Sequence, residues 1–119
     1  MININPNTNI PIFEQIVNEI GKYISLGIYK PDDKLPSVRG LAKDLGINPN
    51  TVARAYETSE QLGLTYSMPG KGHFISKKET SINNLIQPIY KELTHLIKQL
   101  KTLGETNEDI LSYIEREIL

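Results

Sequence analysis

The sequence of 119 residues contains no cysteine, which excludes a disulfide framework and a thiolate metal site. Its apolar runs fall far short of the roughly 20 residues that a membrane-spanning helix needs. The opening stretch MININPNTNI has neither the basic start nor the apolar core of a secretory signal. With 39% hydrophobic and 23% charged residues, the composition is typical of a globular protein. We therefore expect a cytoplasmic protein that makes no membrane contact.

Catalytic and cofactor-binding motifs are also missing. The sequence has no GxSxG motif, and its two histidines, His73 and His95, belong to different segments of the chain. The adjacent Asp32 and Asp33 fit a turn better than a metal site. The chain is too short to enclose a large ligand cavity beside a hydrophobic core. We expect no enzyme activity, no cofactor, no metal and no small-molecule pocket.

A strong positive charge is absent as well, since the formal net charge is −1. The charge is nevertheless divided unevenly along the chain. Residues 1–78 carry nine Lys/Arg and seven Asp/Glu, a net of +2, whereas residues 79–119 carry four Lys/Arg and seven Asp/Glu, a net of −3. Two segments with different partners would explain this division, and an asymmetry of this size also arises by chance.

Two amphipathic helical patterns are present in the first part of the chain. Pro11 opens the first, and Gly27 suits its end. Residues 30–36, KPDDKLP, indicate a turn that leads into a very short extended piece. Ser37 then fits the N-cap of the second helix, and Gly46 ends it. The first apolar stripe consists of Phe13, Ile16, Val17, Ile20 and Ile24, and the second of Val38, Leu41, Ala42 and Leu45.

The stretch GINPNTVARAY, at 46–56, joins the second helix to a third. Asn48 can cap the new helix, and Pro49 fits the first helical position, where no backbone N–H is needed. Two helices joined by such a tight turn form the helix-turn-helix pattern, whose second helix enters the major groove of DNA with its N-terminal residues. A purely structural helical hairpin is the alternative. The predicted buried face is Val52, Ala55, Tyr56, Ser59 and Leu62, and the predicted outer face is Asn50, Arg54, Glu57 and Gln61, with Asn50, Thr51 and Arg54 leading toward the groove.

A β-hairpin pattern follows the third helix at 64–76, LTYSMPGKGHFIS. Leu64, Tyr66 and Met68 alternate before the glycine-rich tip, and Phe74 and Ile75 follow it. A hairpin directly after a helix-turn-helix makes a winged helix. Glycines let a backbone approach a surface closely, so a lysine between them can reach a phosphate or the minor groove. A solvated turn lysine is the alternative for the tip.

Three blocks of the sequence resemble the GntR family of bacterial transcription regulators. They are PIFEQI at 11–16, LPSVRGLAKDLGINPNTVARAY at 35–56 and GKGHF at 70–74. The chain looks most like the YtrA-type subfamily, whose members carry a short two-helix C-terminal segment and no effector domain. The resemblance implies a winged helix-turn-helix, mainly α with a small β-hairpin wing, that binds double-stranded DNA.

The resemblance also implies which residues contact DNA. Arg39 matches a family DNA contact, and Lys71, between two glycines, matches the tip that enters the minor groove. Phe13 stands where tyrosine is common in the family, and His73 where threonine is common. The candidate DNA-binding residues are Ser37, Arg39, Asn50, Thr51, Arg54, Gly70, Lys71, Gly72 and His73.

The C-terminal segment begins after a polar link at 77–81 and carries a heptad seam. Pro88 lies within the seam's helix and either kinks it or marks its start. Gly104 suits the helix end, and Thr106 with Asp109 resembles a capping box for a final short helix. The seam is Ile82, Ile86, Ile89, Leu93, Leu96, Leu100 and Leu103, flanked by Leu85 and Ile97, and the final stripe is Ile110, Leu111, Ile114 and Ile118. The candidate dimerisation residues are Ile86, Ile89, Leu93, Leu96, Leu100, Ile110 and Ile114.

Two helices cannot bury such a stripe alone, so the segment either pairs with a second copy or folds back on the winged helix. Pairing fits better, because helix-turn-helix dimers bind two-fold symmetric sites. We therefore expect a DNA-binding domain at 1–78 and a dimerisation segment at 79–119. The leading hypothesis is a bacterial repressor that binds a two-fold symmetric operator as a homodimer. The alternative is a winged helix that binds proteins and has no specific DNA binding.

Overall fold

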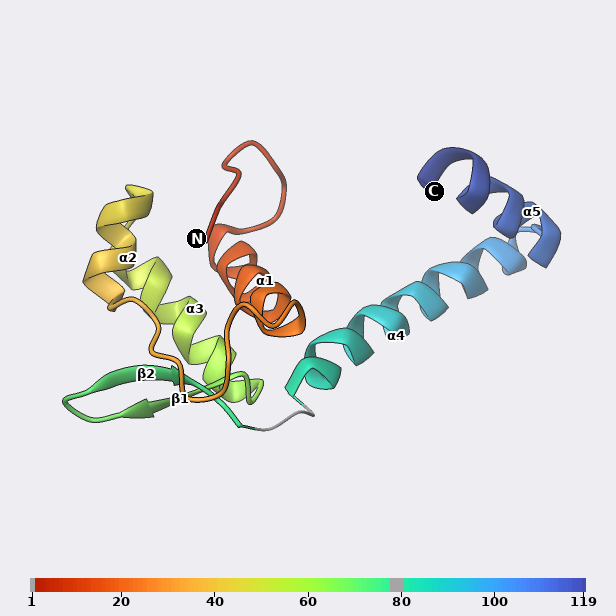
Figure 1. Cartoon of the computed structure of the whole chain (residues 1–119). Helices are drawn as coiled ribbons and strands as arrows, with labels where there is room; N and C mark the ends of the chain where they lie inside the picture. The colour runs from red at the N-terminus through yellow and green to blue at the C-terminus, as the bar shows by residue number, and fades with distance from the viewer. Residues whose placement is uncertain (1, 78–80) are drawn as a thin grey trace. The chain divides into compact units, whose positions relative to one another are not determined.

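The computed structural model describes residues 2–77 and 81–119, with the side chains of 81 and 82 left out. Part of the predicted polar link, residues 78–80, lies outside the described residues. The chain divides into two compact units, Met1–Leu85 and Ile86–Leu119. The order of elements is α1 (Ile12–Ser25), α2 (Val38–Leu45), α3 (Pro49–Gln61), β1 (Thr65–Met68), β2 (Gly72–Ile75), α4 (Ser81–Thr102), α5 (Asn107–Tyr113) and the π-helical turn η1 (Ile114–Ile118) (Figure 1). The predicted fold class, mainly α with a small β-hairpin, is confirmed.

Helix α1 supplies the central apolar face of the first unit. Ile16 and Ile20 are completely buried, and Phe13 and Ile24, at the two ends of the predicted stripe, are partly buried against the same core. The chain leaves the helix through Gly27, whose φ of 73° suits a residue without a side chain. The buried hydrophobic core of the unit is Ile2, Ile16, Val17, Ile20, Tyr23, Leu35, Leu41, Ala42, Val52, Ala55, Tyr56, Leu64 and Ile75.

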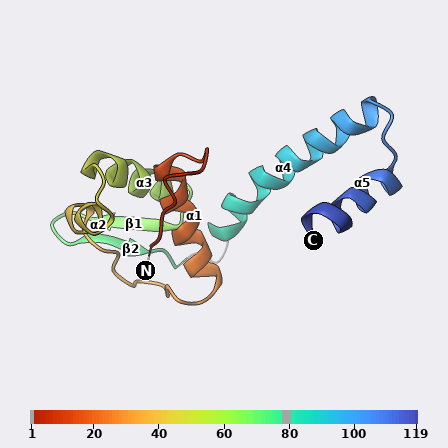
Figure 2. The same ribbon diagram turned by 90° about the horizontal axis from the view of Figure 1, so that it is seen from above.

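Helices α2 and α3 form the predicted helix-turn-helix. Gly46 ends α2 in the left-handed region, with a φ of 67°, as the sequence predicts. The predicted inner face of α3 is also confirmed, because Val52, Ala55, Tyr56 and Ser59 are buried. In Figures 1 and 2, α2 and the tip of the hairpin lie at the same end of the first unit.

The hairpin is antiparallel, and its register pairs Thr65 with Ile75 and Tyr66 with Phe74. Thr65 and Ile75 are buried, whereas the Tyr66 and Phe74 rings stack at 5.6 Å on the opposite face. Leu64, which the sequence pattern placed in line with Tyr66, precedes β1 and is fully buried. The hairpin thus turns one face toward the core and leaves an aromatic pair on the other.

Residues 32–35, which precede α2, pair with β2 along the open edge of this hairpin. The backbone N–H of Asp32 donates to the Ile75 carbonyl at 2.8 Å, and the N–H of Ile75 donates to the Asp33 carbonyl at 2.8 Å. Lys34 forms a β-bridge with Phe74, and the N–H of Leu35 donates to the His73 carbonyl at 2.9 Å. This short extended piece, expected from the sequence at 30–36, ties the base of the wing to the start of α2.

The first turn of α4 belongs to the first unit. The Leu85 side chain lies over Gly21 of α1, where a Cβ would approach the Leu85 Cδ2 to 2.5 Å. The Asn84 amide donates to the Leu62 carbonyl at 3.0 Å. Helix α4 begins before Pro88 and continues through it, so the sequence-based alternative that Pro88 marks the helix start is wrong.

The second unit comprises the rest of α4, α5 and η1. The predicted capping box is present, with the Thr106 hydroxyl accepting from the Asp109 N–H at 3.1 Å and the Asp109 carboxylate accepting from the Thr106 N–H at 2.9 Å. Ile110 is buried as expected, but Leu111 is 60% exposed. Leu111 is therefore not part of the inner stripe that the sequence pattern assigned to it.

Candidate nucleic-acid interface

The turn between α2 and α3 fixes the leading end of α3. The Asn48 side chain accepts from the Asn50 N–H at 2.8 Å, and Pro49 occupies the first helical turn, as predicted. The Thr51 N–H donates to the Asn48 carbonyl at 3.0 Å. With its backbone held in this way, α3 presents the exposed Asn50 and the partly exposed Thr51 side chains at its N-terminal end.

The start of α2 presents a second polar group. The Ser37 hydroxyl accepts from the Gly40 N–H at 3.0 Å, and its own proton remains available for an external acceptor. Arg39, in the first turn, is exposed. The Tyr56 hydroxyl donates to the Pro36 carbonyl at 2.7 Å and anchors this loop to α3. Burial raises the pKa of Tyr56, so the hydroxyl keeps the proton for this hydrogen bond.

The wing tip brings Lys71 out between two glycines. Gly70 has a φ of 75° and Gly72 a φ of 119°, conformations that residues with a Cβ rarely adopt. The Lys71 N–H donates to the Met68 carbonyl at 2.9 Å and closes the turn. The exposed Lys34 side chain passes over Gly72, and its Cε lies 3.2 Å from the place where a Cβ of residue 72 would stand.

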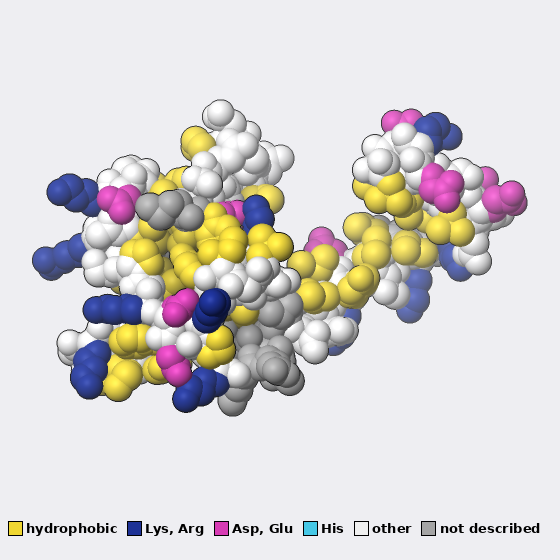
Figure 3. Space-filling view, in the orientation of Figure 1, with side chains coloured by type: hydrophobic (Ala, Val, Ile, Leu, Met, Phe, Trp, Pro, Cys, Tyr) yellow, Lys and Arg dark blue, Asp and Glu magenta, His cyan; other side chains and the backbone are white. Residues whose placement is uncertain are grey.

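Lys34 is a candidate that sequence reasoning missed. Its place beside the wing depends on the pairing of residues 32–35 with β2, which no local pattern indicates. Figure 3 shows Lys and Arg side chains gathered along the edge of the first unit where α2 and the hairpin lie. A basic edge of this kind suits the phosphate backbone of DNA.

His73 lies against the inner side of the wing and not at its tip. Its ring packs edge-on against Tyr56 of α3, with ring centroids 4.9 Å apart. The ring is partly buried, and its Nδ1 atom is buried with no hydrogen-bond partner in the described part of the chain. In this position His73 packs the wing against α3.

Arg54 is exposed, as the outer-face pattern predicts, and its side chain also contacts α1. Its guanidinium carbon lies 3.8 Å from the centroid of the Phe13 ring of α1. The Arg54 side chain is therefore drawn toward α1, beside the outer face of α3. Asn50 and Thr51 remain at the leading end of the same helix.

Below the hairpin, Asp32 joins two neighbouring elements. The Tyr66 hydroxyl donates to its carboxylate at 2.7 Å, and the Lys77 ammonium lies 3.3 Å from it. The hydrogen bond from Tyr66 is the main cause that lowers the pKa of Asp32, and Lys77 lowers it further. Asp32, which the sequence pattern assigns to a turn, thus also holds the wing in place through its carboxylate.

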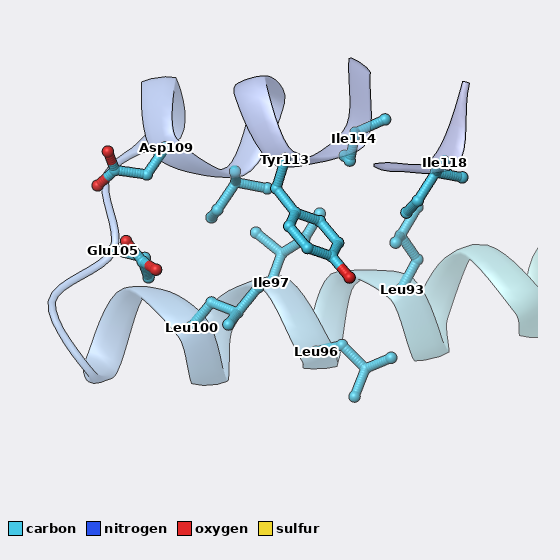
Figure 4. A pocket seen from close by; sticks show the side chains of 10 residues that line it. Leu93, Leu96, Ile97, Leu100, Glu105, Asp109, Tyr113, Ile114 and Ile118 are labelled. Carbon is cyan, nitrogen blue, oxygen red and sulfur yellow. The ribbon is translucent and has the colours of Figure 1, made fainter. Parts of the chain in front are cut away.

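The second unit contains an apolar groove of about 450 Å³ between α4 and the C-terminal helices (Figure 4). The carboxylates of Glu105 and Asp109 lie at one end, and hydrogen bonding to Asp109 raises the pKa of Glu105. The sequence indicated no pocket here. Of the candidate dimerisation residues, Ile86 and Ile89 do not line it, and Tyr113 is a lining residue that the pattern missed. The apolar lining is Leu93, Leu96, Ile97, Leu100, Ile110, Tyr113, Ile114 and Ile118.

Within residues 2–77 and 81–119, no three His, Asp or Glu side chains come together as a metal site would require. The same part of the chain has no helix with the length and apolarity to cross a membrane.

Comparison with known proteins assigns this arrangement to a family. The model of the bacterial regulatory proteins of the gntR family matches residues 12–75. The chain is 38% identical to the HTH-type transcriptional repressor YtrA of Bacillus subtilis over 97% of its length and 90% of that protein.

Two solved structures support the assignment. A GntR family transcriptional regulator from Listeria monocytogenes is 34% identical, with a TM-score of 0.72 over 95% of this chain and 98% of that one. AraR(DBD) in complex with operator ORE1 is 28% identical, with a TM-score of 0.55 over 64% of this chain and 93% of that one. These relatives are transcription regulators and not enzymes, as the sequence predicted. The chain belongs to the GntR family of bacterial regulatory proteins and is similar to its YtrA-type members.

Proposed function

We propose that the chain is a cytoplasmic repressor that binds a two-fold symmetric DNA operator as a homodimer. The observation that carries the proposal is that α2, which leads directly into the capped start of α3, and the tip of the hairpin lie at the same end of the first unit. Arg39 in the first turn of α2 and Lys71 between Gly70 and Gly72 of the tip are both exposed. A winged helix places its recognition helix in the major groove with such residues around it. The similarity to the repressor YtrA and to AraR, which is bound to an operator, supports the same proposal.

Within this proposal the candidate contacts divide by the part of DNA that they reach. Asn50 and Thr51 lead α3 and would meet base edges in the major groove. Arg39 and the Ser37 hydroxyl flank them from α2. Lys71 on the wing would meet the neighbouring backbone or minor groove, joined by Lys34 across Gly72.

The second unit supplies the pairing of two copies. Leu93, Leu96 and Leu100 are 44%, 49% and 41% exposed, and they line a groove that continues onto α5. Apolar surface of this kind gains free energy when a partner covers it. We assign DNA binding to 1–78 and pairing to 79–119, with Leu85 of α4 still packed on the first unit.

A titration with labelled duplexes tests the proposal. The duplexes are inverted repeats from the DNA upstream of the chain's own coding region and scrambled duplexes of equal composition. We expect tight binding to one inverted repeat and weaker binding to its scrambled form. Affinity should fall steeply with salt, because each phosphate contact releases counterions and contributes about 0.9 to the slope of log K against log salt.

The competing function, a protein-binding winged helix, gives the opposite result. Affinity would then be equal for all duplexes and low at physiological salt. Sedimentation of the same samples reports the stoichiometry, for which we expect two chains on each inverted repeat. One chain bound tightly to a single half-site would contradict the dimer.

A further inference from the structure

The contact between Arg54 and Phe13 joins residues of two helices. Phe13 lies in the first turn of α1, partly buried against the core, and its ring faces the Arg54 guanidinium at 3.8 Å. A planar guanidinium over an aromatic face is held by the ring quadrupole. The ring is itself fixed by the core, so it can hold the end of an otherwise flexible side chain in one place.

Stacking leaves the hydrogen-bonding capacity of the arginine intact. The five N–H groups of a guanidinium lie in its plane, and a ring against the flat face blocks none of them. Among the described residues no carboxylate is ion-paired with Arg54, because the ion pairs found there join Lys22 with Glu19, Lys77 with Asp32 and Arg116 with Glu117. The positive charge is therefore oriented but not neutralised.

The direction of the side chain indicates what it would meet. Asn50 and Thr51 hold the leading end of α3, whereas Arg54 is drawn sideways to the first turn of α1. When a recognition helix lies in the major groove, its leading residues meet base edges. Side chains that leave the helix sideways meet the phosphates that border the groove.

We propose that Phe13 is a positioning residue that holds Arg54 as a phosphate clamp at the edge of the major groove, so that Arg54 contributes affinity and not base discrimination. This inference rests on the proposed DNA binding and adds to it the class of group that Arg54 binds. It also gives Phe13, which is partly buried against the core, a role in the interaction.

A mutant cycle on DNA binding tests the pair. The proteins are wild type, Phe13→Met, Arg54→Ala and the double variant, with the inverted repeat and its scrambled form as duplexes. Methionine keeps about the volume of the ring without its π face. Arg54→Ala should weaken binding to both duplexes by a similar factor of about tenfold and reduce the salt slope by about one contact.

The contribution of Phe13 is read from the cycle. Phe13→Met should weaken binding several-fold when Arg54 is present and leave it unchanged when Arg54 is alanine. Phe13→Tyr keeps the aromatic face and should bind like wild type. Arg116→Ala, which removes an exposed arginine of the second unit, is the matched control and should leave affinity unchanged.

A separate measurement covers the case in which Phe13→Met folds poorly. The Arg54 Nε–H resonance of the wild type should carry a ring-current shift that Arg116 lacks, and it should move when DNA is added. Additive effects in the cycle, or an unshifted Arg54 resonance, overturn the positioning role. A loss confined to the inverted repeat makes Arg54 a base contact and overturns the clamp. A wild type that binds no duplex overturns the proposed function together with this inference.

Discussion

At the residue scale, Arg39 is the cation whose removal tests the proposed DNA contact most simply. It is exposed in the first turn of α2, so Arg39→Ala should leave the fold intact. We expect binding to the inverted repeat to weaken by about 1–3 kcal/mol if the arginine reads a base edge. Fluorescence anisotropy measures the change. Lys22→Ala on α1 is the control, and equal affinities of wild type and Arg39→Ala would remove Arg39 from the interface.

Gly72 limits what the wing tolerates. Its φ of 119° is a conformation that residues with a Cβ rarely adopt, so a substitution there strains the backbone even though the nearby Lys34 side chain can move aside. Gly72→Ala should lower the free energy of unfolding by about 1–3 kcal/mol, the usual cost of a strained backbone. Gly70→Asn is the comparison. The φ of Gly70 is 75°, which suits asparagine, and apart from its chain neighbours no atom lies within 4 Å of the place where its Cβ would stand. If urea unfolding gives Gly70→Asn a lower free energy of unfolding than Gly72→Ala, this account is contradicted.

Short-range residue roles were predictable, whereas long-range pairs were not. Asn48, Ser37 and Gly46 act within four residues of their own position, so the sequence predicts their caps directly. The stacking of Arg54 on Phe13 depends on how α1 and α3 pack, and Lys34 reaches Gly72 only after the hairpin pairs with residues 32–35. No periodicity carries that information.

At the element scale, the wing depends on the segment that runs along its outer edge. Asp32 has a φ of 69° and holds both Tyr66 and Lys77, and its pKa lies below the ordinary value in the folded state. A lowered folded-state pKa stabilises the fold above the unfolded pKa of about 3.9, and this stabilisation is lost as pH falls through the folded value.

Asp32→Asn tests this element. Asparagine adopts positive φ readily and still accepts from Tyr66, but it does not titrate. We expect the wild type to lose stability as pH falls below about 4, and the variant to lose less over the same range. Urea unfolding curves at pH 5 and pH 3 measure the difference. Parallel pH dependence in the two proteins would show that Asp32 is not the titrating group.

Element boundaries were largely predictable from caps and stripes, and the departures have physical causes. The capping box at Thr106 starts α5 where the sequence indicates, because both hydrogen bonds are local. The π-helical turn η1 was not predicted, since it widens the last turn without a change in residue pattern. Ile114 and Ile118 stand at the two ends of η1, and both of their side chains line the groove.

At the scale of the whole molecule, the proposed pairing is the property that multiplies every local contact. Two copies at a fixed spacing convert the second half-site contact into an intramolecular event, which raises affinity by about 10² to 10⁴. Leu93→Ala with Leu100→Ala should therefore give monomers and lower operator affinity at least a hundredfold. Neither leucine is among the candidate DNA-binding residues. Sedimentation and anisotropy on the same samples measure both effects.

Leu111→Ala is the matched control for this prediction. Leu111 is 60% exposed on α5 and lies outside the groove, so its removal should leave both sedimentation and binding unchanged. If the wild type itself sediments as a monomer and binds DNA tightly, the groove has another occupant.

The winged helix and its family could be predicted from the sequence, because the family blocks lie in one continuous region. What covers Leu93 and Leu100 could not be predicted from the helical pattern, because a second copy and the winged helix would bury the same stripe.

Pro88 gives α4 a property that can be followed amide by amide. The proline has no N–H, so it offers none to the carbonyl of Asn84, four residues earlier in the helix. The boundary between the two units falls at the residues just after Asn84. In hydrogen–deuterium exchange this missing bond would act as a weak point at which protection in α4 dips. The amides on either side would then report the stability of two separate cooperative units, and DNA and self-association would each slow exchange in its own set.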